Sequence, residues 1–315
     1  MPPSSFRPRL LTTHEVLGEM RMIRSASTKH KLGDDLAWYV FLLPTFLGML
    51  LFMAYPVAAS LRLSFFKSNG VVESWIGVKN YVRIFTSANF WRAVYTTLYL
   101  GFFKMLLAVP AGFMIAYLIN TIRFGKNLFK ILYFIPYVTS IVAAGSIFLF
   151  VLHPSEGLLN SLIGLFGIPK VAWLTQATSA RWGTILLTVW HWLGFVIIIC
   201  IANLQTIPAE LYEASTIDGA SERQQFFYIT IPRMANAFAF LLVMGWIGAM
   251  KIFTETYILG RGNGSPAGAL MTLSGFVYER GFGGVEYGLA SAAAYVLFFI
   301  IFLITLLNTK ISRMN

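Results

Sequence analysis

The sequence predicts an all-α membrane protein with about six transmembrane helices. Of its 315 residues, 57% are hydrophobic and only 12% are charged, and the mean hydropathy is +0.70. A soluble domain of this length would need a charged surface that this composition does not supply. Several apolar runs reach the roughly 20 residues that a helix needs to cross a bilayer. These observations indicate a chain that crosses the membrane several times.

The apolar runs are expected at residues 36–66, 93–120, 128–152, 182–206, 236–259 and 286–308. The first run is longer than a perpendicular helix requires, and it contains Pro44 and Pro56. A proline inside a membrane helix removes one backbone donor, so neighbouring groups must satisfy the freed carbonyl oxygen. The first run is therefore predicted to be a tilted or kinked helix. Together, residues 36–308 are predicted to form one transmembrane permease domain.

Lysine and arginine residues predict the orientation, because short loops rich in these residues stay in the cytoplasm. With the N-terminus inside, the cytoplasmic segments hold more of them than the external segments do. Both termini are therefore predicted to be cytoplasmic, with a basic tail at residues 1–35 and a short C-terminus at residues 309–315. The same orientation puts the loop at residues 207–233 in the cytoplasm. The first apolar run begins too late and is too long for a cleavable signal peptide.

Several classes of function do not fit the sequence. The net charge of +11 does not indicate nucleic-acid binding, because the basic residues lie in the tail and in loops beside the apolar runs. Cys200 is the only cysteine, so no disulfide can form within the chain. His191 has no triad partner at a useful spacing, and His153 has no second metal ligand nearby. The sequence contains no P-loop, so this chain is not expected to hydrolyse ATP.

One polar segment, residues 210–232, lies between two apolar runs and begins with the signals of a short helix. Pro208 suits a first helical position, where its missing N–H costs nothing. Glu210 and Glu213 favour the positive end of the helix dipole. Gly219 then permits a turn, so a helix is expected between Pro208 and Gly219.

A second short helix is expected directly after this turn. Ser221 and Gln224 have the spacing of a capping box, in which each side chain accepts from the other residue's backbone N–H. This pattern predicts a helix through Phe227. Pro232 is then expected to restart the chain at the membrane.

The spacing of residues in this loop resembles the EAA loop of ABC importer permeases. The matching positions are Glu213, Ala214, Ser215, Gly219 and, after nine intervening residues, the Ile-Thr-Ile-Pro run that ends at Pro232. The resemblance implies a coupling helix that docks into a groove on a separate ATPase subunit. Ser215 stands where the family usually has a second alanine, a change small enough to leave a packed face undisturbed. The residues implied to couple to the ATPase are Glu210, Glu213, Ala214, Ser215, Asp218, Gly219, Ala220 and Pro232.

Two further stretches resemble sugar importer permeases related to the larger maltose-system permease and to glycerol-phosphate and oligosaccharide permeases. Residues 75–81, Trp-Ile-Gly-Val-Lys-Asn-Tyr, resemble an F-x-G-x-x-N-Y element. Residues 253–272 resemble an F-D-x-I-Y-x-L-T-x-G-G-P-x-x-x-T element, with Thr254 in place of the aspartate and a looser glycine run. The resemblance covers about residues 36–308 and implies the fold of a type I ABC importer permease.

Two sets of residues are candidates for a sugar pathway. Sugars combine apolar C–H faces with many hydroxyl groups, so a pathway needs aromatic rings, small residues and a few hydrogen-bonding groups. The resemblance implies that the substrate lies between core helices about halfway across the membrane. The candidates at helical spacing are Thr188, His191, Trp192 and Phe195 in the fourth run and Gly245, Gly248, Ala249 and Ile252 in the fifth. Such residues also pack helices together, so helix packing is the alternative.

The sequence is therefore interpreted as a permease subunit of a binding-protein-dependent ABC importer for a sugar of the oligosaccharide class. The resemblance implies a second homologous permease, two P-loop ATPase subunits and an external solute-binding protein as partners, besides the sugar and the lipid bilayer. No nucleic acid, no catalytic residue and no cofactor bound by this chain are expected, since ATP and Mg²⁺ are used by the partner ATPase. The expected location is the cytoplasmic membrane of a bacterium or archaeon.

The alternative function is a secondary transporter or channel for a small polar solute. That class needs ionisable residues that line the core, and Lys104, His191, Lys251 and Glu255 are a poor set for this role. Lys104 lies well inside the second run and is expected to snorkel or to pair within the bundle. Lys251 and Glu255 are four residues apart in the fifth run and are expected to neutralise each other on one helix.

Overall fold

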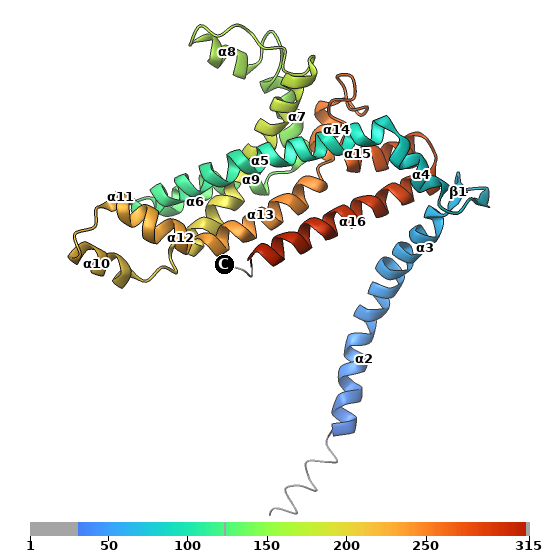
Figure 1. Ribbon diagram of the computed structural model, residues 1–315, viewed down its shortest axis with the longest axis horizontal. Coiled ribbons are helices and arrows are strands. Elements are labelled where there is room, and N and C mark those ends of the chain that lie inside the picture. The colour runs from blue at the N-terminus through green and yellow to red at the C-terminus, as the bar shows by residue number, and fades with distance from the viewer. Residues whose placement is uncertain (1–30, 123, 313–315) are drawn as a thin grey trace, which may run out of the picture. The chain divides into compact units, whose positions relative to one another are not determined.

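The computed structural model describes residues 31–122 and 124–312, and Figure 1 shows its helices and strands. The chain divides into two compact units, residues 1–60 and 61–315, and each is described by itself. Most of the predicted tail at residues 1–35, and residues 313–315 of the predicted C-terminus, lie outside the described residues.

The first unit is a continuous hydrophobic helix in which a π-helical segment interrupts the α-helix. Its elements are α2 (Lys31–Met49), the π-helix η1 (Leu50–Ala54) and the start of α3 (Tyr55–Ser64). Pro56 has no N–H to donate to the carbonyl oxygen of Phe52. Directly before it, the backbone N–H of Tyr55 donates to Leu50 with π-helical spacing. The irregularity expected from the prolines therefore takes the form of a π-helical segment.

Three long helices of the second unit have the length and apolar composition of membrane spans. They are α5 (Ala88–Thr121), α9 (Ala177–Leu204) and α16 (Tyr287–Ser312). With the helical stretch Trp38–Ser64, the described residues contain 4 such helices, or up to 6 if each of two bent helix pairs is one span. The prediction of an all-α membrane protein with about six transmembrane helices is confirmed.

The third apolar run does not form the single helix that residues 128–152 predict. Instead, α6 (Lys126–Val138) and α7 (Ile141–Val151) meet at an angle of 94°. Thr139 between them has an extended backbone, with ψ of 143°. Pro136 stands in the last turn of α6 and cannot donate to the carbonyl oxygen of residue 132, which weakens the helix just before the break.

The fifth run, residues 236–259, is also interrupted. The helix α13 (Ala235–Met250) ends before Lys251, and α14 (Thr254–Leu259) begins three residues later. A cation is favourable at a helix C-terminus and an anion at an N-terminus, so Lys251 after α13 and Glu255 in the first turn of α14 both favour the break. The expectation that these two residues share one helix is therefore wrong.

The core of the second unit lies between α5 and α9. Small side chains that are fully buried, such as Ala108 and Ala116 of α5, share one hydrophobic cluster with Val196 and Cys200 of α9. Small residues let two membrane helices approach closely. A second cluster joins α4 (Lys79–Thr86), α15 (Leu273–Tyr278) and α16.

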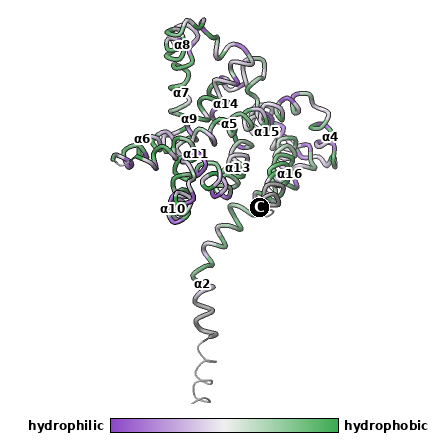
Figure 2. The backbone as a smooth tube through the Cα atoms, turned by 60° about the vertical axis from the view of Figure 1, so that its left-hand side comes forward, coloured by the Kyte–Doolittle hydropathy of each residue, from purple (hydrophilic) through white to green (hydrophobic). Residues whose placement is uncertain are grey.

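Polar segments gather at opposite ends of the second unit. Figure 1 shows α10 (Ala209–Ile217) and α11 (Glu222–Gln225) at one end, and α4 with a small hairpin at the other. The hairpin pairs β1 (Phe66–Ser68) antiparallel with β2 (Glu73–Trp75). Figure 2 shows hydrophilic residues at α10 and around α4 and mainly hydrophobic residues along the long helices. The other described helices are α8 (Leu158–Gly164), the π-helices η2 (Phe226–Thr230) and η3 (Glu279–Gly283), and α12 (Ile231–Arg233).

Candidate coupling loop and substrate pathway

The predicted coupling loop, residues 207–233, begins with α10. Pro208 is the residue before the first helical residue, with an extended backbone (ψ 134°), and its carbonyl oxygen accepts from the N–H of Leu211 at 3.3 Å. Glu210 lies in the first turn, where its negative charge interacts favourably with the positive end of the helix dipole. The helix expected in this part of the loop is confirmed, with its start shifted by one residue.

The end of α10 is a turn that requires glycine. Gly219 has a φ of +81°, in the left-handed region where a side chain causes strain. This conformation lets the N–H of Ala220 donate to the carbonyl oxygen of Ser215 at 2.9 Å, which gives that carbonyl a hydrogen-bond partner at the end of the helix. A Cβ atom at Gly219 would meet nothing within 4 Å, and the space around it is open. Glycine is thus needed here for its backbone conformation and not for close packing.

The capping box expected after the turn is confirmed. The N–H of Gln224 donates to Ser221 Oγ at 3.4 Å, and the N–H of Ser221 donates to Gln224 Oε1 at 2.7 Å. The helix that follows does not stop at Phe227, because α11 continues through η2 into α12. As at Pro56, a π-helical stretch ends just before a proline, here Pro232, and the helix runs through Pro232 without a break. The chain bends by 55° just beyond α12, where α13 begins.

One side chain that the sequence did not single out joins the two halves of the loop. Gln225 Nε2 donates to the carbonyl oxygen of Tyr212 at 3.3 Å, to Ser215 Oγ at 3.0 Å and to Thr216 Oγ1 at 2.9 Å. A further hydrogen bond, 3.0 Å long, joins the hydroxyl groups of Tyr212 and Thr230. Ser215, the position that departs from the family pattern, thus supplies one of the acceptors. These contacts hold α10, α11 and η2 together as one piece.

Most of the predicted coupling residues lie on the surface of the loop. Ser215 and Ala220 are half-buried, and the exposed ones are Glu210, Glu213, Ala214, Asp218, Gly219 and Pro232. Beside them Ile217 is 87% exposed and Tyr228 is 79% exposed. The loop therefore presents apolar side chains among carboxylates, which is unfavourable in water unless another surface covers them.

The four candidate pathway residues of α9 have different environments. Thr188 is buried, and its hydroxyl group donates to the carbonyl oxygen of Ile185 in its own helix. His191 is half-buried, with Nε2 lying 3.2 Å from the carbonyl oxygen of Thr139, at the break between α6 and α7. Trp192 is only 8% exposed and stacks on the half-buried Phe195 with the ring centres 6.2 Å apart. The ring of Trp192 is therefore largely inside the subunit.

The four candidates of the fifth run, three in α13 and Ile252 just after it, divide into packed and open positions. A Cβ atom at Gly245 would lie 2.9 Å from Met105 and from Trp192, so this glycine is a packing contact. Ala249 and Ile252 are buried in a small cluster of hydrophobic side chains. Gly248 differs, because a Cβ atom there would meet only Lys104 Nζ, at 3.8 Å. The structure brings Trp192 and Gly248 together beside Lys104, and Gly245 packs against Trp192.

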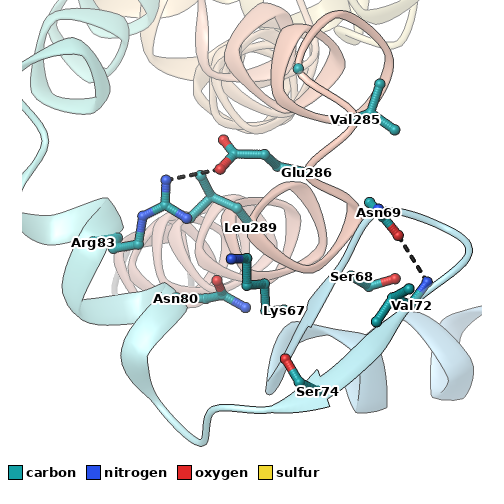
Figure 3. A pocket seen from close by; sticks show the side chains of 11 residues that line it. Lys67, Ser68, Asn69, Val72, Ser74, Asn80, Arg83, Val285, Glu286 and Leu289 are labelled. Atoms are coloured by element: carbon teal, nitrogen blue, oxygen red, sulfur yellow. Dashed lines mark hydrogen bonds and ion pairs between the residues drawn. The ribbon is translucent and has the colours of Figure 1, made fainter.

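A polar pocket of about 400 Å³ lies at the end of the second unit opposite α10. Figure 3 shows Arg83 and Glu286 side by side in its wall, joined by an ion pair of 2.9 Å, with Lys67 lying next to Asn80. Asn80, from the F-x-G-x-x-N-Y-like element, is 1% exposed and donates to the carbonyl oxygens of Ser64 at 2.8 Å and Phe66 at 2.9 Å. This element therefore ties the hairpin to α3 and α4.

Several known proteins are similar in sequence to this chain over most of its length. At 35% identity over 286 residues, it is similar to the probable ABC transporter permease protein YesP of Bacillus subtilis (strain 168), covering 89% of this chain and 91% of that one. At 32% identity over 277 residues, it is similar to the arabinooligosaccharides transport system permease protein AraP of the same organism, with coverages of 87% and 88%.

A solved structure supports the same relationship. The fold is similar to that of a chain of a bacterial alginate ABC transporter in complex with alginate pentasaccharide-bound periplasmic protein, with a TM-score of 0.77 and 27% identity over 90% of this chain and 96% of that one. The family model for the binding-protein-dependent transport system inner membrane component matches residues 108–313, which include the whole loop at residues 207–233. The chain therefore belongs to the family of binding-protein-dependent transport system inner membrane components.

Proposed function

We propose that this chain is a permease subunit of an ABC importer that moves an oligosaccharide across the cytoplasmic membrane of a bacterium or archaeon. The observation that carries the proposal is the two-part loop at residues 207–233, which the Gln225 contacts hold together at one end of a bundle of apolar helices. Relatives support the substrate class, since AraP is described as transporting arabinooligosaccharides and the solved transporter as holding an alginate-bound periplasmic protein.

The loop has the surface expected of a docking element for a separate ATPase. Ile217 projects from the end of α10 with 87% of its surface exposed, between the exposed carboxylates of Glu213 and Asp218. An exposed apolar side chain with charged neighbours fits a groove that has an apolar floor and a polar rim. ATP and Mg²⁺ are then used by the ATPase, and this chain binds neither.

The complete importer contains partners that this chain needs for a transport cycle. They are a second permease, two ATPase subunits and an external solute-binding protein that delivers the sugar. Closure of the ATPases on ATP would bring the docking loops of the two permeases together. This movement would switch the helix bundles between an inward-open and an outward-open state. Because α10, α11 and η2 are held together by side-chain hydrogen bonds, a displacement of the loop is passed to α13 through α12.

In this proposal the loop at residues 207–233 faces the cytoplasm, as do the termini at residues 1–35 and 309–315. Residues 36–308 form the permease domain. The sugar passes the face of the bundle where Phe195 and Gly248 are half-buried, beside His191. Behind this face, the bundle interior contains the buried residues Thr188, Ala249 and Ile252. The contact between Trp192 and Gly245 packs α9 against α13.

Docking through Ile217 can be tested by co-purification. The ATPase should be recovered with the unchanged chain and lost, by about tenfold or more, with Ile217→Asp, because a carboxylate cannot be buried in an apolar groove. The matched control is Phe166→Asp, which alters an apolar side chain that is 83% exposed beyond α8. The ATPase should stay with this control variant. Equal recovery with both variants would show that Ile217 is not at the interface.

A further inference from the structure

Lys104 is a buried cation in the middle of α5. Its side chain is 7% exposed, and its ammonium group lies 4.6 Å from the centre of the Trp192 ring. It forms no hydrogen bond and no ion pair with any residue that the structure describes. The expectation that Lys104 pairs with another charge in the bundle is therefore not met within this chain. A cation inside a membrane is costly, and such residues commonly mark a substrate path.

The position directly beside the ammonium group is occupied by a glycine that has room for a side-chain atom. This glycine is Gly248 of α13, and a Cβ atom at that position would meet Lys104 Nζ at 3.8 Å and no other atom within 4 Å. One turn earlier, Gly245 leaves no such space, because Met105 and Trp192 already fill it. We call the open site formed by Lys104, Trp192 and Gly248 the lysine notch. The notch lies on the face that the proposed sugar path follows.

One opposite charge acts on Lys104 from a distance longer than an ion pair. The carboxylate of Glu255 is the group whose charge acts on Lys104, but it is not within the 4.0 Å of an ion pair. Glu255 is half-buried in α14, and Lys251 is exposed at the end of α13. The ammonium group of Lys104 thus rests on an aromatic face instead of a carboxylate. An aromatic face is a weaker partner than an anion, so an anionic group can displace or supplement it.

We propose that Lys104 is a specificity-determining residue that selects sugars carrying an acidic group, such as the carboxylate of a uronic acid unit. The proposal rests on the proposed function, because it places the sugar on the face with Gly248. A sugar unit in the notch would put its carboxylate against the ammonium group, and glycine would leave room for the ring. A charge-assisted hydrogen bond in a site of low dielectric is strong, and a neutral sugar cannot form it.

The test compares acidic and neutral sugars with the complete importer, including the second permease, the ATPases and the binding protein, in proteoliposomes. The probes are a panel of oligouronides and, for each, the neutral oligosaccharide of the same length and linkage. Lys104→Met should lower kcat/KM for the acidic sugars by about 10-fold to 100-fold relative to their neutral counterparts. Lys104→Arg should keep most of the preference. Because the binding protein is the same in every sample, a changed preference reports on this chain.

Controls separate a role in selection from a role in folding. Lys251→Met removes an exposed lysine at the end of α13, three residues after Gly248, and should leave the ratio of acidic to neutral uptake unchanged. A loss of both kinds of uptake in Lys104→Met, together with a poorly assembled complex, would show that the cation–π contact only packs α5 against α9. An equal change of the ratio in Lys251→Met would also overturn the role of the notch.

The panel also distinguishes the two proposals. If the unchanged importer transports neutral sugars but none of the acidic ones, the inference about Lys104 is wrong and the proposed function stands. If the importer with ATP and binding protein transports no member of either panel, the proposed function fails, and the inference fails with it. Uptake of sulfated or phosphorylated counterparts, measured in the same way, shows whether the notch selects a carboxylate or any anionic group.

Discussion

The side-chain amide of Gln225 donates a hydrogen bond of 3.0 Å to the hydroxyl group of Ser215. This contact joins α11 to α10 across the turn at Gly219. Because the same amide also reaches the Tyr212 carbonyl oxygen and the Thr216 hydroxyl group, a single side chain sets how the two helices lie. The loop can therefore transmit a displacement as one piece.

Removal of this amide should uncouple the loop from the bundle. Gln225→Ala removes the two N–H donors that three acceptors share, and each hydrogen bond contributes about 0.5 to 1.5 kcal/mol of net stability, so transport should fall several-fold at unchanged abundance in the membrane. Ser215→Ala removes one of the three acceptors and should have a much smaller effect. The measurement is sugar uptake for each molecule of ATP hydrolysed. Equal uptake by both variants and the unchanged chain would contradict the role of Gln225.

Gly219 should tolerate only residues that accept its left-handed backbone. Gly219→Val strains the turn, because a β-branched side chain is unfavourable at a φ of +81°. Gly219→Asn is the matched control, since asparagine adopts this conformation more readily. ATP-dependent uptake should be lost with valine and largely kept with asparagine. A loss with both residues would indicate that the docked surface, and not the turn, excludes a side chain.

Two glycines of α13 should respond differently to the same substitution. Gly248→Phe fills the open space before Lys104 and should abolish uptake while the complex still assembles with its ATPase. Gly245→Phe forces atoms into contacts of 2.9 Å with Met105 and Trp192 and should prevent assembly. Size-exclusion chromatography and uptake measured on the same samples distinguish the two effects. If Gly248→Phe also fails to assemble, Gly248 is a packing residue and the proposed sugar path is wrong.

Asn80 should contribute to the stability of the end of the second unit that contains α4 and the β1–β2 hairpin. Asn80→Leu leaves the carbonyl oxygens of Ser64 and Phe66 without their donor inside the protein, at a cost of about 1 to 3 kcal/mol for each. The midpoint of thermal unfolding in detergent should fall by several degrees. Asn69→Ala is the control, because Asn69 accepts hydrogen bonds only from the exposed hairpin turn. A similar shift for both variants would contradict the structural role of Asn80.

Features set by neighbouring residues could be predicted from the sequence. The capping box of Ser221 and Gln224 and the turn at Gly219 depend on a few adjacent residues, and both are present. The apolar runs locate the long helices for the same reason. Hydropathy does not distinguish a bent apolar segment from a straight one, however, so it did not predict the break at Thr139. Pro136, three residues earlier, is the sequence signal that could have indicated this break.

Contacts between distant segments could not be predicted in this way. Gln225 meets Ser215 only because the turn at Gly219 folds α11 back, and nothing in the spacing indicates that pairing. Lys104 and Trp192 lie on different helices, and their contact depends on how α5 packs along α9. The open position of Gly248 likewise follows from its neighbours in space, so glycines 245 and 248 look equivalent in the sequence and differ in the structure.

Uptake of labelled oligosaccharide into proteoliposomes tests the proposed transport most directly. The vesicles contain this chain with its second permease and ATPases, and ATP and the binding protein are supplied on opposite sides of the membrane. Uptake should require ATP on the side of the loop at residues 207–233 and binding protein on the other, and it should stop with a non-hydrolysable ATP analogue. Uptake driven by a proton or sodium gradient without ATP would contradict the account and indicate a secondary transporter.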